Sequence, residues 1–153
     1  GGGTYLAATG TLDAVALLAT LPWALFVTAV LFGKHLDKIE ADGSRGVNTI
    51  VVRIGERRAR ACTTALISAG YLGIALFSIP AIGIFPWFVA PLAGIGAYFA
   101  LPALKIVAAA RPSKAPAGYP LWPLWHVGAA FLASRPAMGA LLTGLVVGAI
   151  LGR

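Results

Sequence analysis

The chain has 153 residues, of which 59% are hydrophobic and only 11% are charged. Because a soluble globular domain carries about 25% charged residues, this composition excludes a soluble domain and predicts an all-α integral membrane protein. The net charge of +7 would suggest nucleic acid as the partner of a soluble protein. Here the cations flank apolar segments, which favours a lipid bilayer and phosphate groups as partners and excludes nucleic acid.

Four apolar segments are predicted to cross the membrane as helices. A spanning helix needs about 20 residues, and three of the segments approach that length. The first contains Pro22, which predicts a kink. The last is short for a bilayer, so it begins earlier, tilts, or stops at the end of the chain. The predicted spans cover residues 14–32, 59–79, 85–104 and 137–151.

An aromatic segment, residues 119–133, precedes the last predicted span. It opens with Tyr-Pro-Leu-Trp-Pro-Leu-Trp from residue 119 onward. It is apolar, but it is too short and too rich in proline to cross a bilayer alone. We therefore predict a separate interfacial or re-entrant segment, with its aromatic rings at the level of the lipid headgroups.

The distribution of cations predicts the orientation of the bundle. The connection between the first two spans carries seven of the twelve lysine and arginine residues, between Lys34 and Arg60. Residues 105–114 carry three more, and the turn at residues 80–86 carries none. Lysine and arginine accumulate in cytoplasmic connections. We therefore expect the loop at residues 33–58 to be cytoplasmic.

The loop at residues 33–58 also holds most of the acidic residues, directly after an apolar span. Carboxylates so close to a membrane are costly to keep, so a functional role is the first expectation. Mg²⁺ binds one or two carboxylates together with phosphate oxygens and water, which favours Mg²⁺ and a diphosphate as ligands of this loop. The candidate metal ligands are Asp37, Asp42 and Glu40, and the candidate diphosphate contacts are Lys34, Lys38, Arg45 and Arg53.

The spacing of the acids sets a geometric condition. On a continuous helix Asp37 and Glu40 share one face. Asp42 lies about 140° round the axis from Asp37, at ~100° per residue. The two aspartates converge only if the helix ends or unwinds near residues 41–43, where Gly43 permits a turn. A charged loop that only fixes topology is an equal alternative on composition alone.

The residues of this loop resemble a known motif. Gly-Lys-His-Leu-Asp-Lys-Ile-Glu-Ala-Asp from residue 33, Gly-Val-Asn-Thr from residue 46 and Arg-Ile-Gly-Glu from residue 53 resemble the second aspartate-rich motif of UbiA-type membrane prenyltransferases. The tail of the motif is similar to the corresponding tail in the branch of the family that prenylates dihydroxynaphthoate in quinone biosynthesis. The segment from Tyr119 is similar to the one before the final helix of some bacterial members.

The resemblance implies a nine-helix bundle around a cavity, with this chain as its C-terminal half and residues 1–153 as a partial domain. In the family, two aspartate-rich cytoplasmic loops bind Mg²⁺ and a prenyl diphosphate. The prenyl group then passes to an aromatic or other hydrophobic acceptor within the membrane. The resemblance also implies a protein of the bacterial inner membrane.

The chain departs from the family pattern in two ways. Asp42 matches the aspartate before the Gly-x-x-Thr tail and Asp37 the earlier acid, but four residues separate them where the family has three. Glu40 could make up the difference. The first motif, of the Asn-Asp-x-x-Asp type, is missing, since Asp13 is the only acid before Asp37. We therefore expect a truncated enzyme that is inactive as this 153-residue polypeptide.

Aromatic and histidine residues supply the remaining candidates. In the family, aromatic rings line the cavity and can stabilise a developing cation. We expect His35 to be a helix-end residue and His126 to be a packing residue rather than a base. The sequence identifies no catalytic residue. The cavity candidates are Tyr71, Tyr98, Tyr119 and Trp125.

Two other classes of protein compete with this interpretation. Asp-Gly-Ser-Arg from residue 42 faintly resembles the motif of CDP-alcohol phosphotransferases. Those enzymes need further aspartates downstream, and no aspartate follows Asp42 here. The other alternative is a non-enzymatic membrane subunit or half-transporter that assembles with a partner chain. Transporters place ionisable residues at the membrane midplane, whereas the acids of this loop lie at a membrane face.

Overall fold

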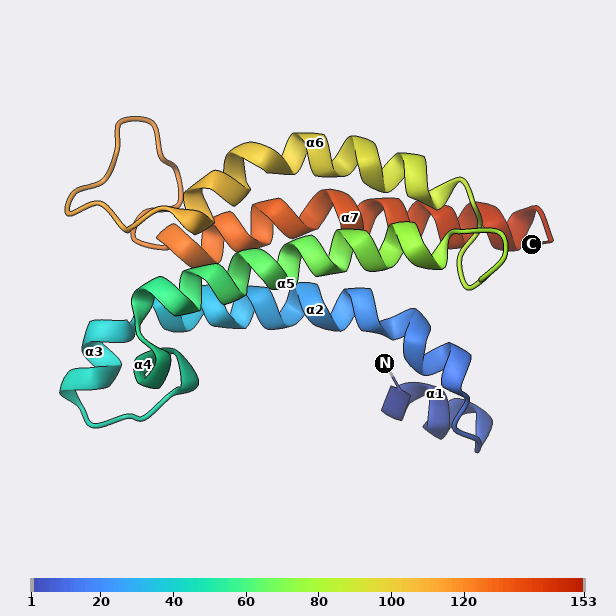
Figure 1. Cartoon of the computed structure of the whole chain (residues 1–153), viewed down its shortest axis with the longest axis horizontal. Coiled ribbons are helices and arrows are strands. Elements are labelled where there is room, and N and C mark those ends of the chain that lie inside the picture. Colours follow the sequence, from blue (N-terminus) through green and yellow to red (C-terminus); the bar gives the residue numbers. More distant parts are fainter. Residues whose placement is uncertain (1, 153) are drawn as a thin grey trace.

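The computed structural model describes residues 2–152 as a bundle of helices (Figure 1). Within these residues, four helices are long and apolar enough to cross a membrane, which confirms the predicted all-α architecture. The helices are α1 (Gly2–Thr9), α2 (Ala14–Leu36), α3 (Ile39–Ser44), α4 (Ile50–Ile54), α5 (Glu56–Phe77), α6 (Val89–Ala108) and α7 (Trp125–Ile150).

The first spanning helix, α2, begins with a side-chain cap. The Asp13 carboxylate accepts the backbone N–H groups of Val15 at 3.2 Å and Ala16 at 3.3 Å, two donors that a helix start otherwise leaves unpaired. Pro22 lies inside the helix and supplies no N–H donor. The ribbon of α2 bends toward its N-terminal end (Figure 1). The helix continues to Leu36, beyond the predicted end at residue 32.

The short helices α3 and α4 form a compact connection at one end of the bundle (Figure 1). The Thr49 side chain caps α4 by accepting the N–H of Val52 at 3.2 Å. Gly55 alone separates α4 from α5, and its φ of 80° lies in the left-handed region that favours glycine. The connection is packed, because the buried side chains of Leu36 and Val51 form an apolar cluster beneath it.

The helix α6 lies later along the chain than the sequence suggested. It begins at Val89 rather than residue 85 and ends at Ala108 rather than residue 104. Pro91 falls in its first turn, where a backbone N–H has no helical partner and proline is accepted. Pro102 lies inside the helix, which membrane helices tolerate because neighbouring helices support the backbone.

The last spanning helix corrects two predictions. The structure has one helix, α7, from Trp125 to Ile150. The predicted span at 137–151 was therefore too short, and the separate interfacial segment at 119–133 was wrong from residue 125 onward. The sequence suggested a boundary at Arg135 and Pro136, but the helix passes through both. The prolines at 120 and 123 precede the helix, so they do not interrupt it.

The long helices pack in a ring, with α5 between α2 and α6, and α7 between α6 and α2. Fully buried side chains such as Phe26, Ile67 and Val89 fill the centre. Close approach between helices requires glycine at particular points. A Cβ atom at Gly144 would overlap the Val89 side chain, and a Cβ at Gly33 would lie 2.8 Å from the backbone carbonyl oxygen of His126.

The outer surface of the ring is apolar. Leu72, Tyr98, Phe99 and Leu142 are each at least 65% exposed. A surface of this kind is a liability in water and is the normal surface of a helix in contact with lipid chains.

Candidate functional site

The first aspartate of the motif lies at a break between two helices. The α2 helix ends at Leu36, Asp37 is its C-cap, and α3 begins at Ile39. Convergence of Asp37 and Asp42 was predicted to need a helix break at residues 41–43. The observed break comes four residues earlier. The consequence is that the Asp37 carboxylate turns toward α7 rather than toward Asp42.

Asp37 caps the N-terminus of α7. Its Oδ1 accepts the backbone N–H of His126 at 2.8 Å, and its Oδ2 accepts the N–H of Val127 at 3.0 Å. The first N–H groups of a helix have no partner within the helix and carry its positive dipole end, so an aspartate is well suited to this place. Gly33, one turn earlier on α2, lets the two backbones approach closely enough for this contact.

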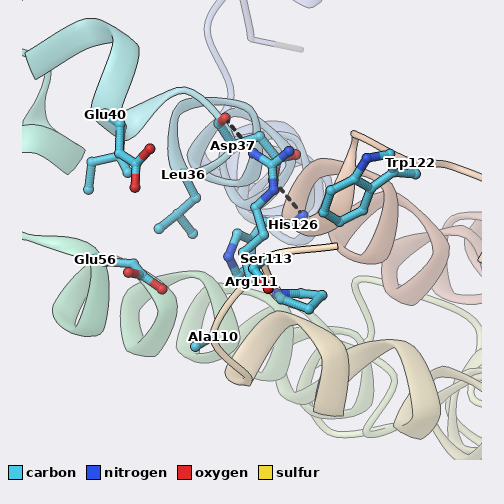
Figure 2. Close-up of a pocket in the computed structure, with 11 residues that line it drawn as sticks. Leu36, Asp37, Glu40, Glu56, Ala110, Arg111, Ser113, Trp122 and His126 are labelled. Atoms are coloured by element: carbon cyan, nitrogen blue, oxygen red, sulfur yellow. Dashed lines mark hydrogen bonds between the residues drawn. The ribbon is translucent and has the colours of Figure 1, made fainter. Parts of the chain in front are cut away.

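Arg111 joins the site from the loop between α6 and α7. Its Nη1 donates a 3.0 Å hydrogen bond to the backbone carbonyl oxygen of Asp37. Its guanidinium carbon lies 4.8 Å from the centre of the Trp122 ring, within the range of a cation–π contact. Figure 2 shows Arg111 between Asp37 and Trp122. One cation therefore ties the motif to a loop more than 70 residues later.

These residues border a pocket of about 460 Å³ (Figure 2), lined from α3, from the loop at 109–124 and from the starts of α5 and α7. Glu40 enters from α3, Glu56 from the start of α5, and His126 from the start of α7. Acidic, basic and aromatic groups thus share one space. The lining residues are Leu36, Asp37, Ile39, Glu40, Glu56, Ala110, Arg111, Pro112, Ser113, Trp122 and His126.

The predicted metal ligands are divided between two places. Asp37 and Glu40 border the pocket. Asp42 does not, and its Oδ2 lies 3.5 Å from Nδ1 of His35, an ion pair when that histidine is protonated. Among residues 2–152, no three histidine, cysteine or carboxylate side chains gather closely enough to form a metal site by themselves.

Three carboxylates line the pocket, and Glu56 is paired with Arg60. Mg²⁺ takes one or two protein carboxylates and fills the rest of its shell with phosphate oxygens and water. Within the described residues, Glu40 forms no ion pair with a lysine, arginine or histidine. Each Asp37 oxygen keeps a free lone pair after accepting one N–H. Glu40 and Asp37 are therefore the pocket carboxylates that keep lone pairs available for a cation.

The predicted diphosphate contacts lie outside the lining of the pocket, and a different cation is found there. Lys34, Lys38, Arg45 and Arg53 do not line it. Arg111 does, and sequence reasoning missed it together with Glu56. The charge pattern contained a signal for Arg111, because residues 105–114 were placed on the same membrane face as the motif. Nothing in the sequence indicated that these residues reach Asp37.

The aromatic candidates separate into three environments. Tyr71 lies in the core, where its hydroxyl donates to the Ala133 carbonyl oxygen at 2.8 Å. Tyr98 is 71% exposed on the outer face of α6. Tyr119 and Trp125 pack against each other beside the site, with ring centres 4.8 Å apart.

The hydroxyl of Tyr119 is held near the start of α7. It lies 3.1 Å from the carbonyl oxygen of Leu124 and 3.0 Å from that of Trp125. Burial raises the pKa of this hydroxyl, and the negative charge of Asp37 raises the pKa further. Tyr119 therefore stays a neutral hydrogen-bond donor at physiological pH.

Comparison with known proteins agrees with the resemblance. The model of the UbiA prenyltransferase family matches residues 2–125. Two curated relatives are each named 1,4-dihydroxy-2-naphthoate octaprenyltransferase. The one from Haemophilus influenzae is 33% identical over 78 residues, and the one from Escherichia coli is 38% identical over 78 residues.

In both relatives the match covers 51% of this chain and only 25% of the relative, so the chain aligns with about a quarter of their length. No solved structure matches the chain significantly. The family match extends over most of the sequence. It includes the motif loop and the helices α3, α4, α5 and α6. The chain therefore belongs to the UbiA prenyltransferase family and is an integral membrane protein.

Proposed function

We propose that the protein transfers a prenyl group from a prenyl diphosphate to an aromatic acceptor within the membrane, with Mg²⁺ as cofactor. The observation that carries the proposal is the pocket at the end of the bundle, where Asp37 and Glu40 of the motif meet Arg111 of the last connection. Carboxylates that hold a divalent cation and an arginine that contacts phosphate are the two elements that binding of a diphosphate requires.

Each residue has a distinct part in this proposal. Glu40 and Asp37 would hold Mg²⁺, which would supply positive charge to neutralise the leaving diphosphate. Arg111 donates to phosphate oxygens while Trp122 supports its guanidinium plane. Asp37 also fixes the start of α7 through two hydrogen bonds. In this proposal one side chain therefore both binds the metal and positions the wall of the pocket.

The acceptor is proposed from the names of the relatives. Both are naphthoate octaprenyltransferases, which supports a hydroxylated aromatic acid as the acceptor. The distribution of cations supports a cytoplasmic position for the pocket, because the two connections rich in lysine and arginine meet at the same end of the bundle (Figure 1). Bacterial relatives support the inner membrane as the location.

We also propose that the 153-residue chain is inactive when it is expressed alone. The described residues bring together no group of three metal-ligating side chains, and family members use a second acidic loop. A non-enzymatic subunit or half-transporter is the alternative. This alternative predicts that membranes containing the protein show no prenyl transfer.

The test is a prenyl-transfer assay on membranes that contain the protein as its own cells make it. Labelled octaprenyl diphosphate and 1,4-dihydroxy-2-naphthoate are supplied with Mg²⁺ or with a chelator. We expect transfer that needs Mg²⁺ and that falls at least tenfold in Glu40→Gln, a loss of about 1.4 kcal/mol of transition-state stabilisation. Transfer that persists in excess chelator would contradict the metal proposal.

The matched control is Asp13→Asn. It removes one negative charge at the opposite end of α2 and keeps a side chain able to cap the helix. We expect its activity to be unchanged. If Asp13→Asn and Glu40→Gln lose activity equally, the loss reflects general damage to the bundle and Glu40 has no specific role.

A further inference from the structure

We propose that the groove between α5 and α6 binds one anionic phospholipid of the surrounding membrane. The lipid phosphate lies at the basic end of the groove, and one acyl chain lies in the apolar part that follows it. This site is separate from the proposed prenyl-transfer pocket and depends only on the membrane location of the chain.

The basic end of the groove is a cavity of about 470 Å³ that lies between the start of α5 and the end of α6. Arg57, Arg60 and Thr64 line it from α5, and Ala108 lines it from α6. Arg60 is fixed in place, because its Nη1 donates to the Ala108 carbonyl oxygen at 2.8 Å. The cavity therefore has a preformed cationic wall.

The charge of the cavity suits one phosphate group. The Nε of Arg60 lies 3.4 Å from a carboxylate oxygen of Glu56, so part of its charge is balanced. Arg57 forms no ion pair within the described residues. One uncompensated guanidinium matches the single negative charge of a phospholipid phosphate better than the several charges of a diphosphate. Basic pockets between helices at the cytoplasmic face are known to take anionic headgroups.

An unpaired buried hydroxyl indicates a polar ligand in the cavity. The hydroxyl oxygen of Thr64 is buried and has no hydrogen-bond partner in the described structure. Buried polar atoms are paired in the great majority of cases, and an unpaired one requires an explanation. An oxygen of a phosphate can accept a hydrogen bond from this hydroxyl.

A second cavity, of about 310 Å³ and apolar, lies farther along the same two helices. Ser68 and Leu72 line it from α5, and Leu101 and Leu104 line it from α6. On each helix this is one turn, about 5.4 Å, farther into the membrane than the basic cavity. Leu72 is 70% exposed and Leu101 is 47% exposed, so the groove opens toward lipid. A basic head cavity followed by an apolar channel matches one amphipathic molecule.

The experiment measures lipid binding and does not depend on catalysis. Purified, delipidated full-length protein is titrated with phosphatidylglycerol, and bound lipid is counted by native mass spectrometry. Phosphatidylcholine, inorganic phosphate and a prenyl diphosphate are titrated in parallel. We expect one tightly bound phosphatidylglycerol and weaker binding of the other three. A site filled equally well by phosphatidylcholine or inorganic phosphate, or better by the prenyl diphosphate, overturns the proposal.

Arg57→Gln tests the basic end of the groove. We expect the affinity for phosphatidylglycerol to fall about fivefold, the usual contribution of one basic residue near an anionic lipid surface. Arg58→Gln is the matched control, because Arg58 is exposed like Arg57 but does not line the cavity. An equal loss in the two variants would mean that general surface charge binds the lipid, and the groove would be rejected.

Ala97→Phe tests the apolar end. Ala97 lines the apolar cavity, so the phenyl ring would fill it. Ala69→Phe adds the same ring at an exposed position on α5 outside the cavity. We expect only Ala97→Phe to weaken binding. If lipid binding follows these variants while prenyl transfer is absent, the proposed function fails and the lipid site stands.

Discussion

The backbone N–H of His126 donates a 2.8 Å hydrogen bond to Oδ1 of Asp37, across 89 residues of sequence. The contact joins the acidic motif to the first turn of the last spanning helix. It also places the buried side chain of His126 at the wall of the pocket that Asp37 borders. The motif is therefore a structural joint as well as a candidate metal site, and the two roles can be separated by mutation.

Asp37→Ala should destabilise the bundle by about 1–2 kcal/mol, because two helix N–H groups lose their acceptor and the dipole of α7 loses a facing charge. Thermal unfolding in detergent measures the effect. Asp42→Ala is the control and should change stability by less than about 0.5 kcal/mol, since the one ion-pair partner of its carboxylate among residues 2–152 is the half-exposed His35. Equal effects would show that Asp37 does not act as a cap.

Gly33→Ala should destabilise the protein by about 1–3 kcal/mol, the usual range for forced overpacking. The added Cβ would lie 2.8 Å from backbone atoms of His126 and Val127, which cannot move without breaking the Asp37 contacts. Gly94→Ala is the control, because a Cβ there meets nothing within 4 Å. That substitution should leave stability unchanged or raise it, since alanine favours a helix. A neutral Gly33→Ala would contradict the close packing of α2 against α7.

Arg111→Lys should lower prenyl transfer by roughly 10- to 100-fold, the range expected when a hydrogen bond to a charged group is lost. Lysine keeps the charge but loses the planar group that stacks on Trp122 and donates to Asp37. Lys114→Gln removes an exposed charge from the same loop and should have no effect. The assay is the prenyl-transfer reaction described above. Wild-type activity in Arg111→Lys would exclude a phosphate-binding role that needs the guanidinium.

The proposed orientation can be tested with single cysteines. The native Cys62 is replaced by serine, and cysteine is introduced as Ser44→Cys in the motif connection or Ala81→Cys in the turn after α5, both at exposed positions. A membrane-impermeant maleimide added to intact cells should label only Ala81→Cys. Labelling of Ser44→Cys alone would reverse the orientation and place the pocket outside the cytoplasm.

Much of the fold could be predicted from the sequence, because a membrane helix is defined by local hydrophobicity. The spans α2, α5 and α6 follow from apolar segments, and their ends differ from the prediction by a few residues. The start of α7 could not be placed in this way. Pro136 and Arg135 normally signal a boundary in a soluble helix, whereas tertiary packing of a membrane bundle supports both inside the helix.

The site was only partly predictable, for a different reason. The acids and the motif are local features, so Asp37 and Glu40 could be selected. Their partners were not, because Arg111 and His126 lie 74 and 89 residues from Asp37 and meet it only through folding. Neither hydrophobic periodicity nor the spacing of residues in a motif predicts a contact between residues so far apart in the sequence. Asp42 was equally prominent in the sequence, but the helix break after Leu36 turned it toward His35 instead.

The long-range cap on α7 has a consequence for how the protein is made. Asp37 leaves the ribosome 89 residues before its partner His126. At about 5–20 residues per second, this interval lasts roughly 4–18 s. Throughout it the Asp37 carboxylate lacks the N–H groups that later hold it, and Arg111 is made only after the first 74 of these 89 residues. The pocket can therefore close only once the start of α7 has been made, after α2, α5 and α6 have already been synthesised.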